Sequence, residues 1–595
     1  MRFWLEQQSQ ETKPEALFPQ PPVIRFISER DRCACGRRLT VQKTRKKTVF
    51  GLIGPFKAHE TVLECKRCNR AYFSEALLRQ VPPRCNVAYA VMIYVGKALF
   101  QQHRNGPDIL ADLASRNIRL SPSEITYLGR KFIMYLAEAH RRTTPKIRKT
   151  MQMAGGYILH LDAMHEGDSP ALMTGIDSLS EIVLGNVKLP SERADHIAKF
   201  LRKIRKDYGQ PAACVHDMGR GICTAVREVF PGVLDFICHF HFLRDIGKDF
   251  LDPAYAMMRK RLQRLSASTR LQTLKRELFR RLEQDEDGAR AIAGAIAASE
   301  LPEESDQFRD AITYSLILWA LNGKNAGDGY GFPFDRPLLT FVDRLADIHR
   351  QMPKLMAGPA SSNQRIKNAL VKLRGITRDI FSDKQLSNAV RELHWRTEVF
   401  DRLRDAMRIA RPGGKNGLND DGDTEAMTSI REGVEAFRRD LDNDNRLKSD
   451  RLALKMAAQI DKYHAKLFAD PIELETSAGK IIVYPQRTNN ILERFFRDWR
   501  RGYRKRTGDN SMCRSLQAML ADTPLVKNLD NPKYMVMLLN GCADLEELFC
   551  GLTDRSTGKL MDQAKKERQV LPGYKALMRM PNLVEHIENL SVGHA

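Results

Sequence analysis

The chain has 595 residues, of which 43% are hydrophobic, and carries a formal net charge of +23. That length exceeds what one hydrophobic core can organise, so we expect three to five domains or subdomains. The excess of Lys and Arg favours a polyanionic partner, because basic side chains release the counterions condensed on phosphates; a soluble protein with a merely basic surface is the alternative. No apolar run approaches the roughly 20 residues that span a bilayer, and the N-terminus has no signal-peptide core, so we expect an intracellular protein.

The N-terminal region contains a close group of cysteines. Residues 1–30 contain several prolines and should form an irregular arm, and β-prone segments then fill residues 31–85. Two pairs of cysteines lie in that second region: Cys33, Cys35, Cys65 and Cys68. Tetrahedral Zn²⁺ binds four such thiolates and supplies folding energy that a small β-ribbon lacks. We therefore predict a structural zinc ribbon, with free buried thiols as the alternative, since the first pair is one residue tighter than the common C-x-x-C.

Residues 86–150 have a helical pattern with one strong start signal. Ser121, Pro122 and Glu124 form a capping box with proline at the first helical position. The two helices around this signal predict a DNA-binding helix-turn-helix, for which an ordinary helical hairpin is the alternative. Arg130 and Lys131 on the second helix are its candidate DNA contacts.

Residues 151–245 have the sequence pattern of several short strands with two helices between them. Strands are predicted at 155–164, 169–178, 181–189, 211–217 and 233–238, with helices at 192–209 and 221–230. The order β-β-β-α-β-α-β is that of the ribonuclease H-like fold, in which an antiparallel hairpin is extended by parallel strands. The fold class is thus multidomain, mixing α+β and α/β parts.

The rest of the chain is predominantly helical. Residues 246–480 carry long amphipathic runs and predict an all-helical insertion, in which Trp319 should lie in the core. A Gly- and Asp-rich stretch at 411–425 predicts an exposed loop. Residues 481–525 should complete the ribonuclease H-like core, and residues 526–595 should form a C-terminal helical tail.

Three acids could form one active site. Asp162 ends the first predicted strand and Asp217 the fourth, and these strands are neighbours in the ribonuclease H-like order. Glu493 lies in an apparent helix that can pack against the sheet. Asp168 or Asp177 would replace Asp162 if the strand ends are shifted, and three unrelated surface acids are the remaining alternative.

A divalent metal would resolve the repulsion among three converging carboxylates. Mg²⁺ prefers hard oxygen ligands, and Mn²⁺ is the other candidate. Two such ions roughly 4 Å apart can activate an attacking oxygen and stabilise a leaving one at phosphorus. Asp162, Asp217 and Glu493 are therefore candidate catalytic metal ligands for phosphodiester cleavage and strand transfer.

The segment around Glu493 interleaves basic and aromatic side chains. At helical spacing Phe495, Phe496 and Trp499 are expected in the core. The basic residues are expected to face DNA phosphates: Arg494, Arg497, Arg500, Arg501, Arg504, Lys505 and Arg506.

A short Cys-His motif follows the fifth predicted strand. Cys238 and His241 could orient the active site or hold a metal. Two ligands are only half of a zinc site, so a buried cysteine beside a core histidine is favoured on spacing alone.

These motifs together resemble a DDE-type transposase, most similar to the bacterial insertion-sequence and Mutator-like groups with a helical insertion. The resemblance covers roughly residues 30–525 and rests on four segments: HLDAM, VHDMGRG, CHFH and NNILER. The acids are 55 and 276 residues apart, and the long second gap fits an insertion. The resemblance implies that Asp162, Asp217 and Glu493 form the catalytic triad and that Cys238 and His241 match the family's Cys-His motif.

The function expected from this resemblance is an enzyme that binds the ends of a mobile element, cleaves there and joins the ends to new DNA. Its partners would be double-stranded terminal-repeat and target DNA and further copies of the chain, as a homodimer or higher oligomer, with no membrane. Its place would be the cytoplasm of a bacterial-type cell, at the nucleoid. The alternatives are a non-cleaving DNA-binding regulator descended from a transposase and a plain metal-dependent nuclease.

Overall fold

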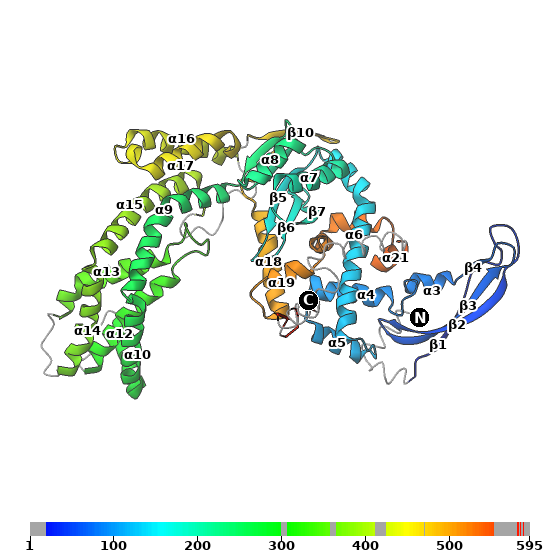
Figure 1. The fold of residues 1–595 in the computed structure, drawn as a ribbon, viewed down its shortest axis with the longest axis horizontal. Helices are drawn as coiled ribbons and strands as arrows, with labels where there is room; N and C mark the ends of the chain where they lie inside the picture. Colours follow the sequence, from blue (N-terminus) through cyan, green and yellow to red (C-terminus); the bar gives the residue numbers. More distant parts are fainter. Residues whose placement is uncertain are drawn as a thin grey trace, which may run out of the picture. The chain divides into compact units, whose positions relative to one another are not determined.

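The chain mixes α and β structure in two compact units (Figure 1). The computed structural model describes residues 20–298, 306–356, 364–410, 424–468 and 470–552 and six positions between 577 and 587. Unit 1 comprises Met1–Asp235, Ile472–Val483 and Asn489–Ala595, and unit 2 comprises Phe236–Pro471 and Tyr484–Thr488.

The predicted β-rich region at the start of unit 1 is a small sheet with strand order β1-β3-β2, to which β4 adds by pairing with β3. Its elements are β1 (Val23–Ile27), β2 (Thr40–Gly51), β3 (Gly54–Cys65), β4 (Arg70–Tyr72) and the following helix α3 (Glu75–Gln80). β1 runs parallel to β3, and β2 runs antiparallel to it. Phe26, Val49 and Phe56 are buried with Leu77 of α3 in one apolar cluster, so α3 covers one face of this sheet.

Three helices follow: α4 (Tyr89–Phe100), α5 (Gly106–Ser115) and α6 (Pro122–Met153). The predicted capping box is present, since the Ser121 backbone N–H donates to Glu124 Oε2 at 2.7 Å and the Glu124 N–H donates to Ser121 Oγ at 3.3 Å. Residues 132–140 of α6 are all buried. A helix that is apolar on every side must lie inside a core, so α6 runs through the interior of unit 1.

The central sheet has strand order β7-β6-β5-β8-β9. The predicted strands and helices are all present, as β5 (Ile158–Met164), β6 (Ala171–Asp177), β7 (Ile182–Leu189), α7 (Ala194–Tyr208), β8 (Ala213–His216), α8 (Arg220–Val229) and β9 (Leu234–Ile237). β5, β6 and β7 pair antiparallel, whereas β5 and β8 pair parallel. One continuous apolar cluster joins this sheet to α6, α7 and α8.

The later part of unit 1 begins with a β-hairpin at Ile472–Val483, most of which was predicted to be helical. β10 (Ile472–Thr476) and β11 (Gly479–Val483) pair antiparallel, and the Ser477 N–H donates to the Met153 carbonyl at 3.0 Å. The remaining elements are α18 (Asn490–Thr507), α19 (Cys513–Ala518), η4 (Thr523–Asp530), α20 (Pro532–Leu539) and α21 (Leu545–Cys550).

The described secondary-structure elements that lie wholly in unit 2 are helices. It comprises α9 (His239–Arg264), α10 (Ala267–Leu282), η1 (Glu283–Asp285), α11 (Glu286–Ala298), α12 (Asp306–Asn322), η2 (Gly323–Asn325), α13 (Pro337–Met356), α14 (Gln364–Phe381), α15 (Lys384–Met407), α16 (Thr424–Asn443), η3 (Leu447–Ser449) and α17 (Arg451–Leu467).

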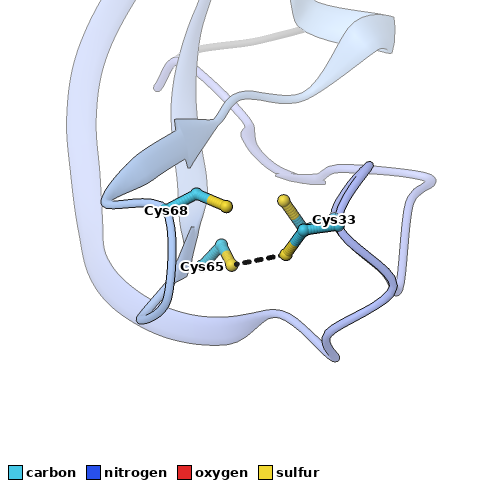
Figure 2. Close-up of side chains that lie close together, drawn as sticks. Cys33, Cys65 and Cys68 are labelled. Carbon is cyan, nitrogen blue, oxygen red and sulfur yellow. Dashed lines mark hydrogen bonds between the residues drawn. The ribbon is translucent and has the colours of Figure 1, made fainter.

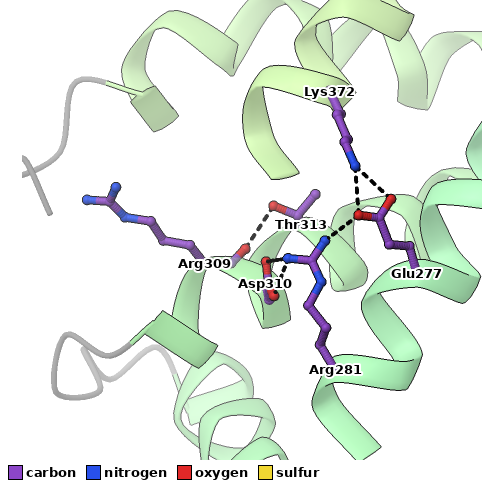
Figure 3. Close-up of polar contacts among 6 residues, drawn as sticks. All are labelled: Glu277, Arg281, Arg309, Asp310, Thr313 and Lys372. Carbon is purple, nitrogen blue, oxygen red and sulfur yellow. Dashed lines mark hydrogen bonds and ion pairs between the residues drawn. The ribbon is translucent and has the colours of Figure 1, made fainter. Parts of the chain in front are cut away.

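Ion pairs connect several of these helices. Arg281 of α10 pairs with Asp310 of α12 at 3.0 Å and with Glu277 at 2.6 Å, and Lys372 of α14 reaches Glu277 at 2.7 Å (Figure 3). Asp310 is largely buried, so its pairing with Arg281 avoids an uncompensated charge between the helices.

One core prediction in unit 2 is wrong. Trp319 is 44% exposed, and the Arg344 guanidinium lies 5.1 Å from its ring centroid. Ile317 and Ala320 of the same apolar run are buried and form the inner face of α12, and Trp319 lies off that face. Of the predicted loop at 411–425, residues 411–423 lie outside the described residues, as do residues 1–19 of the arm and most of the tail beyond 552.

Candidate active site

The two predicted strand-end aspartates lie at the same end of the central sheet. Asp162 is in β5, and Asp217 directly follows β8. The last paired positions of these parallel strands are His160 and Val215, and each aspartate lies two residues further along. Adjacent strands are about 4.8 Å apart, so the two carboxylates start from neighbouring backbone positions. Both residues are half-buried.

The third acid is held to the same strand by Asn489. The Asn489 side-chain amide donates to the Leu161 carbonyl at 2.8 Å, and its Oδ1 lies 3.0 Å from His160 Nδ1. Asn489 is fully buried and directly precedes α18. The Glu493 N–H donates to the Asn489 carbonyl at 2.9 Å. The first turn of α18, with Glu493 in it, is therefore fixed against β5 next to Asp162.

His160 is a neutral member of this contact. Burial lowers the pKa of His160 to about 4, and the hydrogen bond to Asn489 offsets only part of that effect. A carboxamide oxygen can only accept, so Nδ1 carries the proton of the imidazole. His160 thus acts as a fixed donor that orients Asn489.

A fourth acid, which the sequence analysis missed, lies beside Asp217. Burial and the Asp217 charge both raise the pKa of Glu192, and His165 Nδ1 lies 3.8 Å from Glu192 Oε1. Glu192 reaches this place because Gly221 has no side chain: a Cβ there would lie 1.9 Å from the Glu192 carbonyl oxygen. The one sequence signal for this approach is the glycine pair Gly219 and Gly221 after Asp217.

Asp217 is also supported from within its own segment. Its Oδ1 accepts the Gly219 N–H at 3.1 Å. The preceding His216 is fully buried, with Nε2 at 2.6 Å from Asp235 Oδ1 and Nδ1 against the Asp217 carbonyl oxygen. Burial lowers the pKa of His216, but the hydrogen bonds and charges of Asp235 and Cys223 together outweigh burial and raise the pKa to about 10. His216 is therefore a buried cation at neutral pH.

The three predicted acids share this end of the sheet without forming one tight cluster. Among the described residues, the carboxyl oxygens of Asp162, Asp217 and Glu493 do not form a group in which all lie within 4.8 Å of one another. Mutual repulsion of ionised carboxylates favours such separation.

One of the two alternative first acids, Asp177, lies away from this site. Asp177 lies at the opposite end of β6, paired with Ile182 and Leu159. It is 1% exposed and accepts N–H bonds from Ile158, Leu179 and Ser180, so it closes a turn. The replacement of Asp162 by Asp177 is thus wrong, and Asp168 lies exposed in the loop after β5.

The basic residues of α18 separate into two groups. As predicted, Phe495 and Phe496 are each 7% exposed and form the inner face, and Trp499 packs against Phe495 with ring centroids 5.5 Å apart. Six basic residues are exposed: Arg494, Arg497, Arg500, Arg501, Arg504 and Lys505. Arg506 instead faces the protein, where its Nη1 donates to the Leu99 carbonyl at 3.3 Å and burial lowers its pKa.

The candidate DNA contacts of α6 have protein partners. Arg130 Nη2 donates to the Ala518 carbonyl at 3.1 Å, and Lys131 Nζ donates to Cys85 Sγ at 2.9 Å. Lys131 is half-buried, whereas Arg130 is exposed.

The four N-terminal cysteines lie close together and could bind a metal such as zinc; Figure 2 labels three of them, Cys33, Cys65 and Cys68. Their sulfur atoms all lie within 4.8 Å of one another, and Cys35 Sγ is 3.6 Å from Cys65 Sγ. Sulfurs bound to tetrahedral zinc are separated by about 3.8 Å, so the donor set fits this ion. Cys33 and Cys65 each begin a tight turn, closed by the bonds from Gly36 N to Cys33 O and from Asn69 N to Cys65 O.

Hydrogen bonds favour the thiolate form of Cys33. The Cys35 backbone N–H and the Tyr72 hydroxyl, which donates to Cys33 Sγ at 3.1 Å, lower the pKa of Cys33 to about 6. A thiolate is the form that binds zinc.

The Cys-His motif lies at the start of α9 in unit 2, where Cys238 precedes the helix and both Cys238 and His241 are buried. The neighbouring His239, which the sequence analysis did not single out, contacts the Leu467 carbonyl through Nε2 and Arg487 through Nδ1. Burial and the Arg487 charge lower the pKa of His239 to about 3, so it is a neutral structural residue.

Comparisons with known proteins add no identity: no protein-family model and no curated protein matches the chain. In the part of the chain that the structure describes, none of the helices has the length and apolar character needed to cross a membrane.

Proposed function

We propose that the protein is a DDE-type transposase that cleaves DNA at element ends and transfers the cut strand. The strand order β7-β6-β5-β8-β9, with the parallel pair β5 and β8 next to an antiparallel hairpin, supports a ribonuclease H-like core for this chemistry. The observation that carries the proposal is the attachment of α18 to β5 by Asn489, because it ties the helix of Glu493 to the strand of Asp162.

The donor set fits hard divalent cations. Asp162, Asp217 and Glu493 offer oxygens only, which is the ligand type of Mg²⁺ and Mn²⁺. Such ions, when bound as a pair about 4 Å apart, activate the attacking oxygen and stabilise the leaving one. With two ions, each acid need hold only one of them, so the three carboxylates need not lie within one ion's ligand shell. Glu192, beside Asp217, adds further negative charge to this end of the sheet.

The exposed arginines of α18 support a nucleic-acid substrate. Arg494, Arg497, Arg501 and Arg504 recur at spacings of three and four residues, which places them on one face of the helix. That face is opposite the buried Phe495 and Phe496. Guanidinium groups on it would hold the phosphate backbone, on the same helix that carries Glu493.

The test is metal-dependent cleavage and strand transfer on DNA that carries the sequences flanking the gene. Wild type is compared with Glu493→Gln, which keeps the side-chain shape and removes its charge. Glu398→Gln, an exposed glutamate of α15, is the matched control. We expect Glu493→Gln to lose cleavage by at least about 100-fold, on the order of other single catalytic-group removals, with DNA binding retained.

Each other result has a defined meaning. Equal activity of wild type and Glu493→Gln would remove Glu493 from the site. Cleavage without joined products would indicate a plain nuclease. DNA binding without any cleavage in Mg²⁺ or Mn²⁺ would favour the DNA-binding regulator.

A further inference from the structure

One face of the N-terminal sheet has no cover among the described residues. Phe26, Val49 and Phe56 point to the face on which α3 packs. Residues alternate between faces along a strand, so the neighbours of these three point outward. Figure 1 shows α3 beside this curved sheet.

The strand register defines the outward face, which we call the outer face. Three rows cross β1, β3 and β2: Val23–Lys57–Thr48, Arg25–His59–Lys46 and Ile27–Thr61–Thr44. Residues paired across strands point to the same face, and Lys46 and Lys57 are diagonal neighbours, about 7–8 Å apart at Cα. The three cationic residues Arg25, Lys46 and Lys57 are exposed.

The charge of the outer face is of one sign only. Its nine positions include Arg25, Lys46 and Lys57 and no acidic residue. Within the described part of the chain, these three side chains make no ion pair or hydrogen bond. Like charges on one sheet face repel, so a bound polyanion would stabilise this arrangement, and the threonines and His59 add hydrogen-bonding groups.

We propose that the outer face binds the phosphate backbone of double-stranded DNA. The inference rests on the proposed function only for the choice of DNA as the polyanion. Cationic side chains and hydroxyls are the groups that contact phosphates. The nine positions hold no Phe, Tyr or Trp, which single-strand binders use to stack on bases. The outer face therefore fits the phosphate backbone of a duplex better than the unstacked bases of a single strand.

The other face of the same sheet does not offer this surface. There Arg45 lies over the Phe73 ring at 5.5 Å, and Lys47 Nζ donates to the Cys85 carbonyl at 3.0 Å. Glu60 accepts the Ser74 N–H at 3.1 Å. Two cations of that face are thus engaged with the protein.

The test measures binding of the full chain to a labelled duplex of arbitrary sequence, without Mg²⁺ or Mn²⁺, at a series of KCl concentrations. The neutralised variant is Arg25→Gln, Lys46→Gln, Lys57→Gln. The matched control, Lys149→Gln, Lys199→Gln, Lys206→Gln, removes the same charge from exposed lysines elsewhere in unit 1. The slope of log K against log salt should fall by about 3 in the neutralised variant, with at least tenfold weaker binding at 100 mM KCl than the control.

A charge-conserving variant separates backbone contact from base reading. Arg25→Lys, Lys46→Arg, Lys57→Arg should bind within about twofold of wild type, because phosphates accept either cation. Equal affinity and slope of the neutralised variant and the control would overturn the inference. Loss of binding to phosphatidylserine vesicles with DNA binding unchanged would assign the face to a membrane, and a change in oligomeric state alone would assign it to a second copy. A wild type that binds DNA through this face but never cleaves it would overturn the proposed function and leave the inference standing.

Discussion

The Asn489 side-chain amide donates to the Leu161 carbonyl at 2.8 Å, across 328 positions of sequence. Leu161 directly precedes Asp162, and Asn489 directly precedes the helix of Glu493. One buried amide therefore sets the separation of two acids that belong to distant parts of the chain.

Replacement of Asn489 by Ala should destabilise unit 1. The change leaves His160 Nδ1 and the Leu161 carbonyl without this partner in a buried place. A buried group that loses its hydrogen bond costs about 1–3 kcal/mol, so we expect a loss of about 2–4 kcal/mol in urea unfolding. Asn510→Ala, at an exposed position, should change stability by less than about 0.5 kcal/mol. Equal stability of the two variants would contradict the anchoring role.

Gly221 should not tolerate a side chain. A Cβ at this position would lie 1.9 Å from the Glu192 carbonyl oxygen, which is backbone and cannot rotate away. Gly221→Ala should destabilise the protein by at least about 1–3 kcal/mol, as overpacked sites do, and should displace Glu192. Gly375→Ala is the control, since a Cβ in α14 would meet nothing within 4 Å and alanine favours helix by about 1 kcal/mol. Thermal melts of the two variants should therefore shift in opposite directions.

Glu192→Gln should weaken the binding of Mg²⁺ in the proposed reaction. The Asp217 charge, together with burial, raises the pKa of Glu192, and a nearby cation would be attracted by both carboxylates. We expect a several-fold higher Mg²⁺ concentration for half-maximal cleavage, with the rate at saturating Mg²⁺ within about threefold of wild type. A variant with unchanged metal dependence would show that Glu192 has no part in cation binding.

The titration of His216 should make the free energy of unfolding decrease as the pH rises into the alkaline range. Burial lowers its pKa, but the interactions with Asp235 and Cys223 together raise the pKa to about 10, above the value near 6.5 of an unfolded histidine. The raised pKa contributes stability that is fully present below about pH 6.5 and is lost as the pH rises through about 10. Urea unfolding from pH 6 to 10, without divalent metal, should show a decline in wild type that is smaller in His216→Gln. Parallel pH curves would mean that His216 is neutral.

The four N-terminal cysteines should hold one zinc ion per chain. Cys35→Ser removes one of the four sulfurs that lie within 4.8 Å of one another, so elemental analysis should show reduced zinc and the N-terminal sheet should become protease-sensitive. Cys85→Ser, outside the cluster, should retain the ion. Zinc-free wild-type protein with an intact sheet would rule out a structural metal.

Local patterns were sufficient to predict the strands of the central sheet and the capping box at Ser121. These features depend on neighbours in sequence: an apolar run of strand length, or a serine three residues before a glutamate. The burial of Phe495 and Phe496 on the inner face of α18 followed from helical periodicity, which also depends only on neighbours in sequence. The spacing of the four N-terminal cysteines in two pairs also predicted that their side chains lie close together.

What the sequence analysis missed depends on approaches between distant segments. Glu192 reaches Asp217 only because Gly221 admits its backbone, and His216 becomes a cation because Asp235, in the neighbouring strand β9, accepts its hydrogen bond. The burial of Lys131 and Arg506 likewise comes from segments far away in sequence. Composition marks these residues as basic, but it does not say which of them solvent reaches.

The chain leaves unit 1 after Asp235 and returns to it at Ile472, yet every acid of the candidate site belongs to unit 1. Asn489 ties Glu493 to β5 by side-chain bonds, so the placement of this acid does not depend on the length of the intervening polypeptide.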